Sequence, residues 1–276
     1  FNLQPHETKT ARFAVSMKAS VYYVDSTYTG NIKNGFIATP YTNIKDAVAG
    51  IKANGPEKAY IYLMSDTEVD STIEIPSDVD ITIETTDYTL PSNFISNEQI
   101  TNIPPVRYPV DGARKKITRK AGFNDDMFVV KDGTSTSLTL ADIIIDGGSS
   151  TTNKGSIVNA SKGFLKLKNG VEIKNNFINE GNAAESEKPA IRAKASALEI
   201  SGDAELTVRK ATVTGNKSIN GSAINFNGSA FKLQDSKVVV FDNHLADGVR
   251  QANVYLDANK IIDIKDDDGQ TTSLDG

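Results

Sequence analysis

The chain has 276 residues, 38% of them hydrophobic, so it is long and apolar enough to bury a substantial core. It contains no cysteine and no tryptophan, which excludes disulfides, thiolate chemistry and zinc sites built from cysteine. The formal net charge of −5 gives no general argument for a nucleic-acid partner or for an anionic membrane surface. No run of about 18 apolar residues occurs, so we expect no insertion into a membrane.

Two strands and a helix are predicted near the start of the chain. Residues 21–25 and 59–64 alternate apolar and polar side chains in the manner of strands. Between them, Asn43 is a candidate N-cap for a helix that ends near Gly55. One face of this helix collects Ile44, Ala47, Val48 and Ile51. We expect the helix to close one end of a strand stack, where strands would otherwise expose core and edge.

A long irregular segment interrupts the next strands. Short strands are predicted at 73–76 and 79–83, and a basic strand at 116–120. The segment 84–114 contains four prolines and is too long for an ordinary turn. Long loops of this kind often carry function, so we expect a functional excursion or a lid beside the basic strand.

From about Phe128 onward the chain repeats short apolar-x-apolar strands separated by turn residues. One column of equivalent strands is predicted at 128–130, 157–159, 191–193, 224–226 and 254–256. A second column is predicted to begin at Leu138, Leu165, Leu198, Phe231 and Ile262. A third contains 143–145, 171–173 and 238–240, and the unit with residues 206–208 carries extra residues. Three short strands in each repeat are typical of a β-helix coil.

Two further features agree with stacked coils. The middle residues of the second column are Thr139, Lys166, Glu199, Lys232 and Asp263, whose charges alternate in sign as cross-strand neighbours should. Asn176, Asn216 and Asn243 recur after the third strand, where asparagine suits left-handed turns and stacks on its own kind. We interpret these asparagines as a turn ladder and not as a functional cluster.

The motifs in this order resemble pectin-lyase-like β-helix domains over roughly residues 21–264. The residues that carry the resemblance are 23–25, the helix at 43–54, 61–63, 73–79, 138–140 and 145–148. The resemblance implies an all-β fold, a right-handed parallel β-helix with an N-terminal capping helix. It implies one domain over 1–276, with the cap in 1–58, the coils in 59–264 and an acidic tail in 265–276.

The resemblance is specific for fold and weak for function, because these coils carry lyases, hydrolases, tailspikes and adhesins. Galacturonan hydrolases of the family use a Gly-His-Gly segment, whereas the histidines here are His6 and His244. The carboxylate pair Asp125 and Asp126 is interpreted as part of a solvated turn. The columns show no run of aspartates for calcium. We therefore expect no catalytic residue, no metal and no cofactor.

The repeat units beginning at Gly155 and Gly221 look most like the binding regions of Gram-positive surface adhesins, including serine-rich-repeat adhesins. That likeness implies an extracellular, cell-wall-anchored, monomeric module of a longer bacterial surface protein. The expected partner is a host glycan, a glycoprotein or an acidic polysaccharide. A polysaccharide lyase or hydrolase is the first alternative, and a structural stalk without a ligand is the second.

Two surfaces are candidates for binding. Lysine and arginine hold acidic sugars, and aromatic rings pack against sugar faces. The first candidate surface combines Arg107, Tyr108, Arg114, Lys116 and Lys120. The second is the predicted outer row of the first column, formed by Arg192, Asn225 and Tyr255 on consecutive coils. Plain solvated faces are the alternative interpretation of both.

Overall fold

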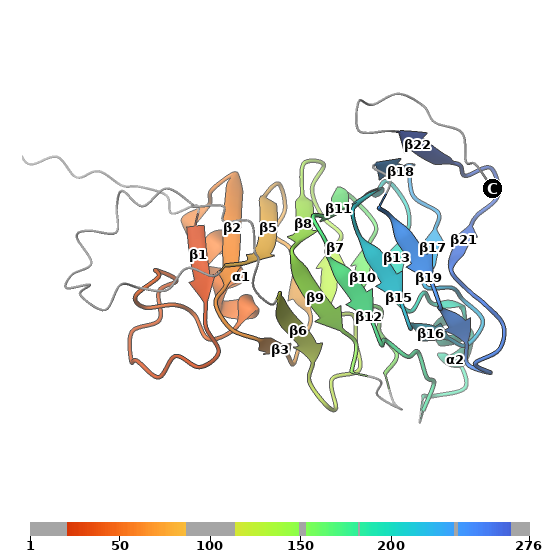
Figure 1. Ribbon diagram of the computed structural model, residues 1–276, viewed down its shortest axis with the longest axis horizontal. Coiled ribbons are helices and arrows are strands. Elements are labelled where there is room, and N and C mark those ends of the chain that lie inside the picture. The colour runs from red at the N-terminus through yellow and green to blue at the C-terminus, as the bar shows by residue number, and fades with distance from the viewer. Residues whose placement is uncertain (1–20, 87–113, 149–152, 182, 235–236, 266–276) are drawn as a thin grey trace, which may run out of the picture.

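The computed structural model describes residues 21–86, 114–148, 153–181, 183–234 and 237–265. Strands dominate these ranges, and the named strands pair with one another in parallel. In Figure 1 they lie side by side along the long axis of the molecule, from β1 at one end to β21 and β22 at the other.

Most of the described strands belong to three sheets. Sheet 1 contains, in spatial order, β1 (Val21–Val24), β2 (Lys58–Leu63), β5 (Asp80–Thr85), β8 (Ser137–Ala141), β11 (Phe164–Lys168), β14 (Glu205–Arg209), β18 (Ala230–Gln234) and β22 (Ile262–Lys265). Sheet 2 contains β4 (Ile73–Glu74), β7 (Phe128–Val130), β10 (Val158–Ala160), β13 (Leu198–Ile200), β17 (Ile224–Phe226) and β21 (Val254–Leu256). Sheet 3 contains β3 (Thr67–Val69), β6 (Lys115–Arg119), β9 (Ile143–Asp146), β12 (Glu172–Lys174), β15 (Thr212–Thr214) and β19 (Val239–Phe241). The short strands β16 (Lys217–Ser218) and β20 (His244–Leu245) form a separate pair.

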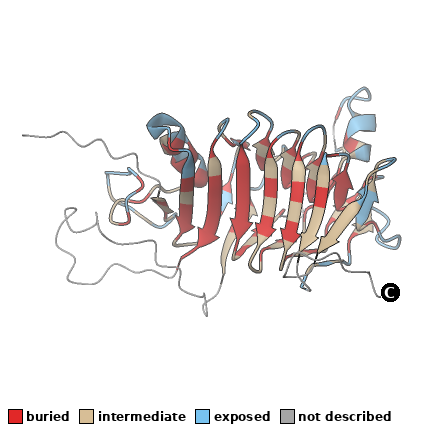
Figure 2. Ribbon diagram, turned by 90° about the horizontal axis from the view of Figure 1, so that it is seen from above, coloured by how far each residue is buried: buried red, intermediate tan, exposed pale blue. Residues whose placement is uncertain are grey.

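The chain passes through sheets 3, 2 and 1 in turn, and we call one such circuit a coil. Each strand therefore pairs with its equivalents one coil earlier and one coil later, about 4.8 Å away. In sheet 1 the inward residues Leu138, Leu165, Leu206 and Phe231 occupy equivalent positions. All four are almost fully buried. Figure 2 shows this buried interior continuing from strand to strand.

The predicted helix is confirmed as α1 (Ile44–Asn54). The side chain of Asn43 accepts a hydrogen bond from the backbone N–H of Asp46 at 2.8 Å, which caps the first turn. Gly55 ends the helix in the left-handed conformation, with φ of 61°, and donates its N–H to the Ile51 carbonyl. The apolar face of α1 is buried, and the helix packs beside β1 to β4 at one end of the stack.

The predicted strand at 191–193 is wrong, because these residues end the short helix α2 (Lys188–Ala193). Pro189 in the first turn favours helix initiation. The strand of sheet 2 in this coil is β13, and β10 begins at Val158 and not at Ile157. The leading residues of equivalent sheet 2 strands are Phe128, Val158, Leu198, Ile224 and Val254.

Because a strand was wrongly predicted at 191–193, one strand of the predicted second column is also misplaced. Leu206, not Leu198, stacks between Leu165 and Phe231. The outward residue between Lys166 and Lys232 is consequently Thr207, and the alternation of charge through Glu199 is wrong. The predicted third column is confirmed for 143–145, 171–173 and 238–240, while residues 206–208 belong to sheet 1.

The asparagine ladder is confirmed and is longer than predicted. Asn176 donates its backbone N–H to the Asn216 side-chain oxygen at 3.1 Å, and Asn216 donates to Asn243 at 3.1 Å in the same way. Asn153 and Asn253 extend the ladder at its two ends. The residues preceding the three predicted members, Asn175, Gly215 and Asp242, adopt left-handed conformations with φ of 57°, 63° and 53°. The ladder therefore satisfies buried backbone groups at one corner of successive coils.

Leu167→Asp should unfold the protein. Leu167 is fully buried in β11, so the variant would place an unpaired carboxylate in the core and lower the free energy of unfolding by at least about 4 kcal/mol. Circular dichroism during thermal and urea denaturation measures the effect. Lys166→Asp is the matched control, because the neighbouring side chain points outward and should tolerate the same change. A folded Leu167→Asp variant would refute the register.

Asn216→Ala should destabilise the corner without abolishing the fold. It removes side-chain hydrogen bonds to Thr214, Asn243 and Asn176, leaving buried backbone groups without partners. We expect the free energy of unfolding to fall by about 3 kcal/mol. Urea titration compares this variant with Asn227→Ala, which changes an exposed asparagine and should have little effect. Equal effects would show that the ladder contributes no stability.

Candidate functional site

The first predicted surface is only partly within the described structure. Arg107 and Tyr108 lie outside the described residues. The Arg114 guanidinium forms an ion pair with Glu172 at 3.0 Å and also hydrogen-bonds the Gly170 carbonyl, so it is held against the neighbouring coils. Its charge is therefore already engaged.

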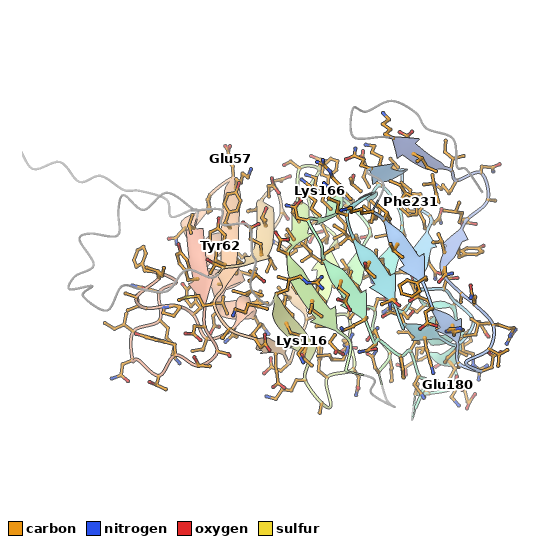
Figure 3. All side chains as sticks on the ribbon, in the orientation of Figure 1. Glu57, Tyr62, Lys116, Lys166, Glu180 and Phe231 are labelled. Atoms are coloured by element: carbon orange, nitrogen blue, oxygen red, sulfur yellow. The ribbon has the colours of Figure 1, made fainter. Side chains whose placement is uncertain are left out.

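Lys116 and Lys120 do lie together, along a shallow hollow of about 550 Å³ between β3 and β6. Figure 3 shows Lys116 on this part of the stack. The same hollow contains the carboxylates of Asp66, Glu68 and Asp70, and Lys120 is 3.7 Å from Asp70. The surface is therefore of mixed charge and not the basic patch that the sequence suggested.

Two of the three residues of the second predicted surface are neighbours in the structure. Asn225 and Tyr255 are cross-strand partners in β17 and β21. Arg192 is not in their row, because it lies on α2 and makes a two-pronged ion pair with Glu180 at 2.7 and 3.1 Å. Figure 3 labels Glu180 near the end of the molecule that contains β21. The residue that pairs with Asn225 one coil earlier is Glu199.

We define the outer row of sheet 2 as Asn159, Glu199, Asn225 and Tyr255, which occupy equivalent outward positions on four consecutive coils. The Asn225 side-chain amide donates to Glu199 Oε2 at 3.2 Å, and the backbone N–H of Ala195 donates to the same oxygen at 2.7 Å. Tyr255 is 55% exposed at the end of the row. The row thus offers fixed polar groups followed by an accessible ring.

Asp126 joins the row through two hydrogen bonds from residues 156–159 and an ion pair with a residue just after α2. Its Oδ2 accepts from the Asn159 amide at 2.9 Å, and its Oδ1 accepts from the Ser156 backbone N–H at 2.7 Å. Lys194, just after α2, forms an ion pair with Oδ1 at 2.7 Å. These contacts hold the end of α2 against the outer face of sheet 2.

A cleft lies between α2 and sheet 2, beside Glu199, and we call it the α2 cleft. Its volume is about 540 Å³, in the range of small-ligand sites. The charged residues that line it are Asp125, Lys154, Glu187, Lys194 and Glu199. Lys154 lies 3.6 Å from Glu187, so both lysines of the cleft have carboxylate partners. The extra residues of this coil, which form α2, thus create a hollow on an otherwise regular face.

The carboxyl group of Glu199 in the α2 cleft has a raised pKa. Partial burial raises its pKa above the ordinary value of 4.5, and the nearby negative charge of Asp126 acts in the same direction. The hydrogen bonds from Ala195 and Asn225 and the charge of Lys194 act in the opposite direction but do not cancel the effect of burial. Perturbed carboxyls in clefts are enriched at functional sites.

The sequence analysis did not identify Glu199, Asp126 and Lys194 as neighbours beside one cleft. Glu199 was placed in the second column because residues 191–193 matched the pattern of a strand. Pro189 was the available signal that these residues form a helix instead. Asp126 was interpreted as a solvated turn residue, and nothing local in the sequence shows that it meets Asn159 and Lys194.

No family model matches the chain, and no curated protein and no solved structure is significantly similar to it. In the described part of the chain, no helix has the length and hydropathy needed to cross a membrane. No group of three or more histidine or acidic side chains within the described ranges is arranged to hold a metal ion.

Glu199→Gln should remove a pH dependence of stability. Because the folded protein raises the pKa of Glu199, the folded chain holds this proton more tightly than the unfolded chain does. The wild-type protein should therefore lose stability relative to the variant as pH rises from about 4.5 through the folded pKa, and regain it as pH falls. Urea titrations across this window measure the difference. Glu185→Gln, which changes an 86% exposed side chain, is the control. If the difference in unfolding free energy between the wild type and Glu199→Gln did not change with pH, the raised pKa of Glu199 would be contradicted.

Proposed function

We propose that this chain is the carbohydrate-binding region of a bacterial cell-surface adhesin, built on a right-handed parallel β-helix of the pectin-lyase-like kind. The parallel three-sheet architecture supports the fold. The motifs that resemble adhesin binding regions support the location outside the cell. In this proposal the module works as a monomer within a longer surface protein.

The observation that carries the proposal is the outer row of sheet 2 beside the α2 cleft. Successive positions in the row are about 4.8 Å apart, close to the length of one monosaccharide unit. An oligosaccharide lying along the axis would therefore pass from Glu199 to Tyr255 over Asn225, which is buried and whose amide holds Glu199 in place. The Glu199 carboxylate can accept hydrogen bonds from sugar hydroxyls, and the exposed ring of Tyr255 offers an apolar face.

Hydrolysis of a glycan is the second candidate function, and the raised pKa of Glu199 near the carboxyl group of Asp126 favours it. Two nearby carboxyl groups, one of them with a raised pKa, are the arrangement used for acid–base cleavage of glycosidic bonds. Here both oxygens of Asp126 are engaged by Ser156, Lys194 and Asn159. These contacts fix Asp126 in place and favour a role in structure, so we rank binding above cleavage.

The first experiment is a glycan-array screen of the purified protein, with the same glycans assayed for new reducing or unsaturated ends. Saturable binding without new chain ends is the expected result. Cleavage would replace the adhesin with a hydrolase or lyase. Absence of both binding and cleavage would favour a structural stalk.

Tyr255→Ala should weaken binding of an array ligand about tenfold, because the ring no longer packs against a sugar face. Isothermal titration calorimetry measures the change. Phe241→Ala is the matched control, since Phe241 is 50% exposed on β19 of a different sheet. Lys116→Ala separates the two candidate surfaces. If Lys116→Ala lost binding and Tyr255→Ala retained it, the site would lie in the hollow between β3 and β6.

A further inference from the structure

The charges around the α2 cleft limit the class of sugar that it can hold. Its lining contains three carboxylates, from Asp125, Glu187 and Glu199, but only two ammonium groups, from Lys154 and Lys194. A fourth carboxylate, Asp126, lies directly behind Lys194 at 2.7 Å. With the buried guanidinium of Arg119, which interacts with Asp125 and Asp126, the surroundings contain four carboxylates and three cationic groups and are acidic by one charge.

Both ammonium groups already have carboxylate partners. Lys194 is held by Asp126 at 2.7 Å, and Lys154 lies 3.6 Å from Glu187 in a looser, more exposed pair. A uronic acid would have to break one of these ion pairs while its carboxylate approached the remaining acidic groups. Juxtaposing like charges at a binding site is costly, and breaking an existing pair adds to that cost.

Sugar hydroxyls, by contrast, match the groups that the cleft and the row present. A hydroxyl donates to a carboxylate without adding charge, and Glu199 is already oriented by Asn225 and the Ala195 backbone. Along the row, Asn225 and Tyr255 add no net charge. A neutral oligosaccharide therefore gains hydrogen bonds at this surface and loses no ion pair.

We propose that the α2 cleft and the adjoining row select neutral oligosaccharides and discriminate against uronic acids. This inference rests on the proposed function and specifies its ligand class. It also separates this surface from the lysine-containing hollow on sheet 3, where an acidic polysaccharide was the expectation from the sequence.

The test uses matched pairs of oligosaccharides that differ only at C6, with a hydroxymethyl group in one and a carboxylate in the other. Calorimetric titration of each pair should show the neutral member binding at least about tenfold more tightly. Asp126→Asn should reduce this preference, because it frees the charge of Lys194 while an amide at the same place can still accept from Ser156. Asp263→Asn, on β22 in a different sheet, is the control and should leave the preference unchanged.

The outcomes distinguish the two proposals. Tighter binding of the uronic acid member, or a preference that Asp126→Asn does not alter, would overturn the inference while leaving a carbohydrate-binding function in place. Failure of every array glycan to bind would overturn both.

Discussion

The parallel pairing of each strand with its equivalent one coil away is the constraint on which the rest of the structure depends. It fixes the inward residues in stacks such as Leu138, Leu165 and Leu206, and it sets the spacing of every outward residue along the axis. The same pairing leaves corners where backbone groups would be buried without partners. The asparagine ladder occupies one of these corners, so stacking of coils and satisfaction of polar groups are achieved together.

A regular stack by itself presents flat faces, and a binding site requires a departure from regularity. The coil that contains α2 supplies one. Its extra residues leave the stack after β12, form the helix and return to β13. The ion pair of Lys194 with Asp126, which precedes β7, holds the end of this excursion against the coil two turns earlier. The cleft and the perturbed carboxyl of Glu199 both follow from that insertion. A repetitive scaffold therefore positions the residues of the α2 cleft, while a single irregular coil gives the cleft its shape.

Much of this fold could be predicted from the sequence, because local patterns carry it. The capping helix was correctly placed from Asn43, Gly55 and one apolar face, and the spacing of apolar strands identified three sheets. The register failed at Ile191, because three residues of apolar-x-apolar pattern fit a strand and a short helix equally well. Because of that error, the sequence analysis assigned Glu199 to the second column and not to the outer row of sheet 2. The contacts of Asp126 with Asn159 and Lys194 join segments about 30 residues or more apart, so no local pattern could reveal them.

The central claim is that a glycan lies along the outer row of sheet 2 and enters the α2 cleft. Hydrogen–deuterium exchange in the presence of a saturating array ligand tests this claim most directly, since it reports which backbone segments the ligand covers. The account predicts slower exchange in residues 186–200, 222–227 and 253–257, with no change in 66–70 or 115–120. Protection confined to 66–70 and 115–120 would place the ligand on the hollow of sheet 3 and contradict the claim.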